Sequence, residues 1–192
     1  GREGPVAEVS IEFAPGKAVA PAASFPLTDK PAGATLAGNV KFTGEGALFG
    51  DGYMVLPHRP EWDLNAGFTL TFDFKADKTA EMPVLLSHGQ WQMDGWFIQI
   101  LGGSLIARTS KGDAQGPPIE PGRWYSVRFV YDGALLYLFI DGKPFGQSMA
   151  PASQAVAANR PLVIGQYDVA DPQYAFRGMI RNVAIYSDVV MP

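Results

Sequence analysis

The segment Phe68-Thr-Leu-Thr-Phe-Asp-Phe-Lys75 alternates strictly between apolar and polar residues. Successive side chains of an extended strand point to opposite faces, so the phenylalanines and Leu70 would share one face and the polar residues the other. A sheet with one face in a core and the other in water has this pattern. The segment therefore predicts a half-buried β-strand, and no helix accommodates the same period.

Two Asp-Gly pairs lie further along, and they bracket another candidate strand. Asp132-Gly133 and Asp141-Gly142 enclose residues 134–140, which are apolar on both faces. Asp-Gly suits the type I′ turn, which needs positive φ at both central positions. The spacing predicts a meander of residues 124–131, residues 134–140 and a short strand after Gly142.

Strand patterns dominate the rest of the chain. Glycine or proline interrupts most helical patterns, and only the alanine-rich segment 153–159 could form a turn or two of helix. The further expected strands are Glu8–Phe13, Ala47–Phe49, Tyr53–Leu56, Pro83–Ser87, Trp96–Leu101, Ser104–Thr109, Leu162–Ile164 and Ile180–Tyr186. These elements predict an all-β fold, a two-sheet antiparallel β-sandwich of jelly-roll type. Without a linker or internal repeat, we expect a single domain over residues 1–192.

Composition excludes several classes of protein. The 192 residues are 47% hydrophobic and 18% charged, which argues against intrinsic disorder. A net charge of −4 without a basic run argues against nucleic-acid binding. No apolar run approaches the roughly 18 residues that cross a bilayer, so we expect no membrane insertion. The absence of cysteine excludes disulfides and thiolate chemistry. The chain begins at Gly1 without a methionine or signal segment, so we expect a processed or excised piece of a longer protein.

Several motifs follow one another in a recognisable order along the chain. They are Gly46–Pro57, Phe68–Lys75, Gly95–Ile100, Gly122–Gly133, Leu136–Gly142, Pro161–Gly165 and Phe176–Tyr186. This order resembles the laminin-G-like domains of the concanavalin A-like lectin/glucanase superfamily, from about Val9 to Tyr186. The resemblance implies a jelly roll whose first and last strands pair. It also implies an extracellular, periplasmic or cell-surface location, often as an accessory module of a carbohydrate-active enzyme.

The catalytic motif of this superfamily is incomplete in the chain. Its glucanases carry Glu-x-Asp-x-x-Glu, because glycan hydrolysis needs two carboxylates flanking the bond. The only Glu-x-Asp here is Glu61-Trp62-Asp63, and Ala66 stands where the second glutamate belongs. An enzyme is therefore the third hypothesis for this chain, after two non-catalytic ones.

The resemblance also implies a structural calcium ion near two acidic positions, and both positions differ here. The first reads Phe49-Gly50-Asp51-Gly52, with the acid displaced by one residue, and the second has Arg181 in place of an acid. Asp51 stays a candidate Ca²⁺ ligand, with a turn residue as the alternative. We expect no required cofactor and no strong dependence of folding on calcium. His58 and His88 are too few for an all-histidine metal site. Both are expected at surface junctions between a strand and a loop.

Aromatic residues in polar loops are the remaining sequence feature that indicates a ligand-binding site. Trp91 lies among amide and carboxylate side chains at 88–95, and Tyr167 lies in a similar loop at 166–174. A sugar stacks its C–H face on such a ring and bonds its hydroxyls to planar polar groups. Capping of the sandwich ends is the alternative role for these rings. The resemblance places these two loops on the same lip of the sandwich, so we expect them to converge on one site. The candidate ligand-binding residues are Trp91, Tyr167, Gln90, Gln92, Asp94, Gln166, Asp168, Arg177 and His88.

The other three tryptophans receive different interpretations. Trp62 lies in a polar loop and is a weaker binding candidate, whereas Trp96 and Trp124 lie among aliphatics in strand patterns and are expected in the core.

The leading hypothesis is a non-catalytic carbohydrate-binding module of a larger secreted or cell-surface protein. The alternative is a structural or adhesion module that packs against a neighbouring domain or a protein partner. The expected partners are a glycan or polysaccharide and other domains of the same chain.

Overall fold

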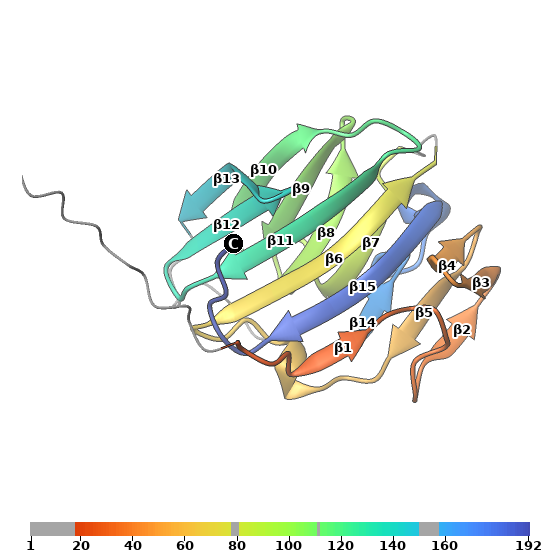
Figure 1. The fold of residues 1–192 in the computed structure, drawn as a ribbon, viewed down its shortest axis with the longest axis horizontal. Helices are drawn as coiled ribbons and strands as arrows, with labels where there is room; N and C mark the ends of the chain where they lie inside the picture. Colours follow the sequence, from red (N-terminus) through yellow and green to blue (C-terminus); the bar gives the residue numbers. More distant parts are fainter. Residues whose placement is uncertain (1–17, 78–80, 111, 150–157) are drawn as a thin grey trace, which may run out of the picture.

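The computed structural model describes residues 18–77, 81–110, 112–149 and 158–192, which form two antiparallel sheets lying one behind the other (Figure 1). The front sheet has eight strands in the order β13 (Lys143–Met149), β12 (Leu135–Ile140), β11 (Trp124–Tyr131), β6 (Phe68–Ala76), β15 (Gly178–Tyr186), β4 (Gly46–Phe49) and β3 (Val40–Thr43), with β1 (Ala23–Phe25) paired to β15. The other sheet has seven, in the order β10 (Asp113–Pro118), β9 (Ser104–Thr109), β8 (Asp94–Leu101), β7 (Val84–Gln90), β14 (Leu162–Ile164), β5 (Tyr53–Leu56) and β2 (Thr35–Ala37). The expected two-sheet β-sandwich is confirmed.

The alternating segment forms β6, which lies between β11 and β15 in the front sheet. All four of its apolar side chains are buried in the core between the sheets, as predicted. The opposite face departs from the prediction at Thr69, which is also buried. Its hydroxyl donates to the Asp188 carbonyl at 2.7 Å and accepts from the Val190 N–H at 2.9 Å. The C-terminal segment therefore covers part of a face that the sequence pattern assigns to water.

The predicted meander is present as β11, β12 and β13. Asp141 and Gly142 have φ of 52° and 77°, as a two-residue type I′ turn requires. The expectation is wrong at Asp132, because only Gly133 of that pair has positive φ. The Asp132 carboxylate instead accepts the N–H groups of Ala134 and Leu135, so side-chain hydrogen bonds shape this turn.

Several expectations concern the ends and edges of the sheets. The expected strand Glu8–Phe13 lies outside the described residues, as does most of the helix candidate at 153–159. Among the described strands the first and last, β1 and β15, pair with each other. Strands β1, β2, β3 and β10 were not anticipated, because the first three have only three or four residues and β10 contains the glycine and prolines tolerated at a sheet edge. No helix in the described part of the chain has the length and apolar character needed to span a membrane.

Two tryptophans join the core and hold one loop in place. Trp96 is fully buried, as predicted, and its indole Nε1 donates to the Trp62 carbonyl at 2.7 Å. The interpretation of Trp62 as a loop ring for sugar binding is wrong, since this side chain is also fully buried. The short 3-10 helix η1 (Pro60–Trp62) turns the chain inward, and the Trp62 indole donates to the Pro57 carbonyl at 3.0 Å.

Trp124 corrects a second expectation, because it lies on the outer face of the front sheet. Its neighbour Tyr125 enters the core, so strand alternation turns Trp124 away from it. The Arg181 guanidinium lies 3.9 Å from the centre of the Trp124 ring, and the Lys75 ammonium lies 5.2 Å from it. A cation–π contact, not core packing, is therefore the environment of this tryptophan.

Candidate functional site

The outer face of the seven-stranded sheet carries a groove whose floor is β8. Trp96, Ile98 and Ile100 of this strand enter the core, so Phe97 and Gln99 point outward. Both are nevertheless almost inaccessible, at 3% and 4% exposure, because loops cover them. The floor is thus closely packed, and the Gln99 amide donates to the Met82 carbonyl at 3.2 Å.

Three aromatic residues from loops form the walls of this groove, which we call the Trp91 groove. Trp91 lies on the turn between β7 and β8, Tyr167 follows β14, and Tyr174 ends the 3-10 helix η2 (Pro172–Tyr174). The groove has a volume of about 390 Å³ and is lined by Met82, Val84, Trp91, Phe97, Gln99, Leu101, Arg108, Tyr167 and Tyr174. Loops that are far apart in sequence therefore converge here, as expected for Trp91 and Tyr167.

Contacts among these rings fix their positions. The Tyr167 hydroxyl accepts the Trp91 backbone N–H at 2.6 Å, and the Tyr167 ring meets those of Phe97 and Tyr174 edge-on at 5.1 and 5.0 Å. Burial raises the pKa of Tyr167, while the hydrogen bond from Trp91 acts in the opposite direction. The Trp91 side chain stays 53% exposed, so a fixed backbone presents an open indole face.

Among the described residues, Arg108 of β9 is the one cationic side chain in the lining of this groove. Its guanidinium carbon lies 5.1 Å from the centre of the Trp91 ring and 5.9 Å from that of Phe97. Asp113 of β10 accepts from the same guanidinium at 3.0 Å. The charge is thus partly balanced, while the planar group lies among aromatic rings.

Four polar residues behind Trp91 form a closed network. Arg160 donates through Nε to both carboxylate oxygens of Asp94, at 2.8 and 2.9 Å, and through Nη1 to Asp168 at 3.1 Å. Gln90 donates to the same Asp168 at 2.7 Å. Hydrogen bonding to Asp94 raises the pKa of Arg160, which stays charged. Gln90, Asp94 and Asp168 therefore join two loops to each other, and Arg160 was missed by sequence reasoning.

Replacing Arg160 with alanine is expected to lower the free energy of unfolding by about 1–3 kcal/mol, because two partly buried carboxylates lose charge-assisted hydrogen bonds. Urea denaturation of the variant measures this loss. Arg123→Ala is the matched control, since its ion pair with Asp141 is exposed and should contribute less than about 1 kcal/mol. Equal losses in the two variants would contradict the structural role assigned to Arg160.

The two remaining glutamines of the candidate set differ in environment. Gln166 is 4% exposed; it donates to the Asp171 carbonyl at 3.1 Å and accepts the Tyr167 N–H at 2.8 Å. Gln92 is exposed at the tip of the Trp91 turn, with φ of 60°. Gln166 therefore shapes the Tyr167 loop, and Gln92 is the one of the pair that faces solvent.

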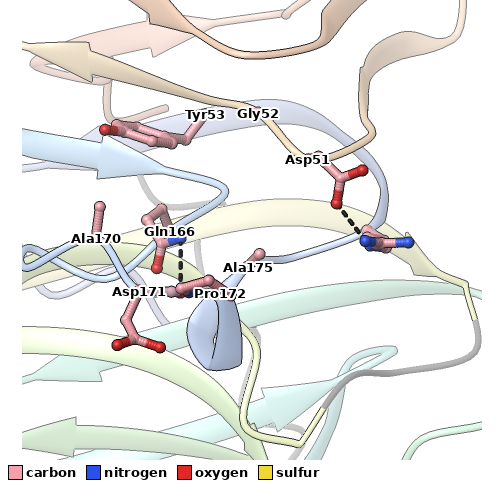
Figure 2. A pocket seen from close by; sticks show the side chains of 9 residues that line it. Asp51, Gly52, Tyr53, Gln166, Ala170, Asp171, Pro172 and Ala175 are labelled. Carbon is pink, nitrogen blue, oxygen red and sulfur yellow. Dashed lines mark hydrogen bonds and ion pairs between the residues drawn. The ribbon is translucent and has the colours of Figure 1, made fainter.

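Arg177 does not join the Trp91 groove, which corrects the expected set. It lines a second hollow of about 280 Å³, together with Asp51, Tyr53 and Gln166 (Figure 2). There its guanidinium donates to the Asp51 carboxylate. Arg181, at the other position considered for calcium, contacts Asp73 at 3.2 Å. With guanidinium groups beside the nearby carboxylates, these side chains do not fit the oxygen-rich set that Ca²⁺ takes.

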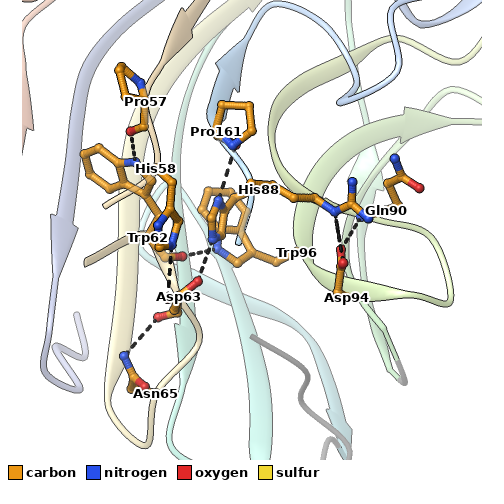
Figure 3. Close-up of polar contacts among 11 residues, drawn as sticks. Pro57, His58, Trp62, Asp63, Asn65, His88, Gln90, Asp94, Trp96 and Pro161 are labelled. Carbon is orange, nitrogen blue, oxygen red and sulfur yellow. Dashed lines mark hydrogen bonds and ion pairs between the residues drawn. The ribbon is translucent and has the colours of Figure 1, made fainter. Parts of the chain in front are cut away.

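His88 also departs from its expected place at a surface junction. Strand β7 continues through it, and the imidazole is fully buried on the core side, 6.1 Å from the Trp96 ring centre. Its Nε2 lies 2.8 Å from Asp63, and its Nδ1 lies 3.3 Å from the Pro161 carbonyl (Figure 3). His88 therefore cannot contact a ligand in the Trp91 groove.

Comparisons with solved structures show the same fold in sugar-associated proteins. Domain 4 of AbnA, a GH43 extracellular arabinanase from Geobacillus stearothermophilus, was solved with arabinotriose; it is 16% identical, with a TM-score of 0.61, over 83% of this chain and 84% of that one. The binding domain of botulinum neurotoxin DC in complex with SialylT is 11% identical, with a TM-score of 0.60, over 82% of this chain. A botulinum neurotoxin type C structure, whose title describes cell entry through two ganglioside molecules, is 10% identical, with a TM-score of 0.61, over 82% of this chain.

At 10–16% sequence identity, these structures show similarity to this chain in fold alone. This chain covers 43% of each of the two neurotoxin chains, less than half of their length. No curated protein matches the sequence. A family model described as the concanavalin A-like lectin/glucanases superfamily matches residues 48–192, which run from within β4 through the C-terminal segment. The chain belongs to the concanavalin A-like lectin/glucanases superfamily.

Proposed function

We propose that this chain is a non-catalytic carbohydrate-binding module of a secreted or cell-surface protein, and that it holds an oligosaccharide in the Trp91 groove. The observation that carries the proposal is the half-exposed Trp91 ring, whose backbone is fixed by the Tyr167 hydroxyl. A residue whose backbone is already held in place loses less conformational entropy on binding.

The chemistry of the groove suits a sugar. A pyranose or furanose ring would place its C–H face on Trp91, and stacking contributes about 0.5–1.5 kcal/mol beyond the buried area. Arg108 places a planar polar group beside the rings, where it could bond to hydroxyls. The AbnA domain solved with arabinotriose and the neurotoxin domain solved with SialylT support binding of this class in the same fold.

The positions of the acidic residues support a role without catalysis. No carboxylate is among the described residues that line the Trp91 groove, whereas glycoside hydrolysis needs two at the scissile bond. Glu61 of the incomplete glucanase motif contacts Arg59 at 2.9 Å, and Asp63 lies between two histidines on the core side. Neither residue can act on a sugar held beside Trp91.

Isothermal titration calorimetry with a panel of soluble glycans tests the proposal. The panel should contain arabino-oligosaccharides, β-glucan oligomers and sialylated oligosaccharides, each with and without EDTA. We expect one class to bind with a Kd between about 10 µM and 1 mM, because a shallow groove recovers little beyond the cost of association. Binding should be unchanged by EDTA. An absence of binding to every member would contradict the proposal and favour a protein partner at the exposed Trp91 and Met93.

A further inference from the structure

Both histidines of the chain meet one carboxylate, that of Asp63 (Figure 3). None of these three residues lines the Trp91 groove. His58 follows β5, Asp63 follows η1, and His88 lies on β7. The Asp63 carboxylate lies 3.3 Å from His58 Nε2 through one oxygen and 2.8 Å from His88 Nε2 through the other. The two imidazole rings are stacked, with centres 5.7 Å apart. Three atoms that bind metals therefore converge within 4.8 Å of one another.

The surroundings of His88 favour a cation beside its Nε2. The ring is fully buried, and both nitrogens face oxygen atoms, the Pro161 carbonyl at Nδ1 and Asp63 at Nε2. A neutral imidazole has one N–H group, so it can donate to only one of these oxygens. Donation from Nδ1 to a backbone carbonyl is the usual arrangement for a histidine whose Nε2 binds a metal. A metal ion at Nε2 would satisfy that nitrogen and the carboxylate together.

The loop that carries Asp63 is held rigidly by indole hydrogen bonds. Trp62 donates to the Pro57 carbonyl, and Trp96 donates to the carbonyl of Trp62. The Asp63 backbone N–H closes η1 through the Pro60 carbonyl at 3.1 Å. A site built on such fixed elements loses little entropy when it binds an ion.

The cluster is also accessible from one side. The His58 side chain is 30% exposed and that of Asp63 is 16% exposed, whereas His88 is closed off. An ion could enter past His58, and water could complete its coordination there. Two imidazole nitrogens and one carboxylate with an open position form the three-ligand set typical of Zn²⁺, and the nitrogens disfavour Ca²⁺ and Mg²⁺. We propose that His58, Asp63 and His88 bind one divalent transition-metal ion, with Zn²⁺ as the best fit.

Calorimetry of the chelator-treated chain with ZnCl₂ alone tests this site. We expect one ion per chain with a Kd in the low micromolar range or tighter, and a melting temperature higher by roughly 5–10 °C at a hundredfold excess over Kd. Co²⁺ in place of Zn²⁺ should give the intense visible absorption of a cobalt ion with four or five ligands.

Three variants make the test specific. His58→Ala and Asp63→Asn should each weaken binding at least tenfold and reduce the cobalt absorption, and the partial exposure of both side chains lets the variants fold. Glu61→Gln is the matched control, because this carboxylate lies on the same turn but pairs with Arg59, and it should bind as the wild type does. No binding, or binding unaffected by His58→Ala and Asp63→Asn, would overturn the proposal and leave His88 and Asp63 as a hydrogen-bonded pair.

Discussion

Trp96→Ala is expected to lower the free energy of unfolding by about 3–5 kcal/mol, as measured by urea denaturation. The side chain is fully buried, and its ring lies 5.5 Å from that of Phe68 and 6.4 Å from that of Phe129, both in the opposite sheet. Truncation would leave a large cavity between the sheets. It would also leave the Trp62 carbonyl without its indole donor.

The matched control for this prediction is the same substitution at Trp124. That ring lies on the outer face and contacts the Arg181 guanidinium, so Trp124→Ala should cost only about 1 kcal/mol. Equal losses in the two variants would show that the assignment of core and outer face along β8 and β11 is wrong.

Trp91→Ala is expected to weaken glycan binding at least tenfold while shifting the melting temperature by less than about 3 °C. The substitution removes the open face on which the sugar stacks, but it removes little from the core, because the side chain is half exposed. Calorimetry with the best glycan of the panel and a thermal melt measure the two effects on the same sample.

Two further variants distinguish the loss of ring stacking from a loss of folding. Trp91→Phe should keep part of the affinity, since a smaller ring still offers a flat face, and Trp124→Ala should bind as the wild type does. If Trp91→Ala unfolds the protein, or binds sugar as well as the wild type, the Trp91 groove is not the binding site.

The sequence predicts the central strands well because their signals are local. Alternation at 68–75 and the paired positive φ angles of Asp141 and Gly142 depend on neighbouring residues alone. Trp124 was misplaced because its position in a largely apolar strand pattern suggested burial, although its immediate neighbours are Arg123 and Tyr125. The alternation of Tyr125, Val127 and Phe129 toward the core carried the correct signal, since it turns Trp124 outward.

The candidate site is less accessible to sequence reasoning because its contacts are distant along the chain. The loops of Trp91 and Tyr167 were expected to converge, and the hydrogen bond between them joins residues 76 positions apart. Arg160, which holds one loop through Asp94 and the other through Asp168, carries no local pattern that could identify it. His88 was assigned to a junction because β7 was expected to end at Ser87, whereas the strand continues to Gln90.

The four tryptophans lie in different environments, so the intrinsic fluorescence of the protein can distinguish ligand binding from unfolding. Trp62 and Trp96 are sealed from water and should emit at short wavelength, where unfolding, or a metal ion beside the neighbouring His88, would change the intensity. Trp124 lies against the Arg181 guanidinium on the outer face of the front sheet, so its emission should respond to neither sugar nor metal. Trp91 alone combines an exposed indole with the proposed ligand groove. A change confined to the long-wavelength edge of the emission would therefore report occupancy of that groove without any label.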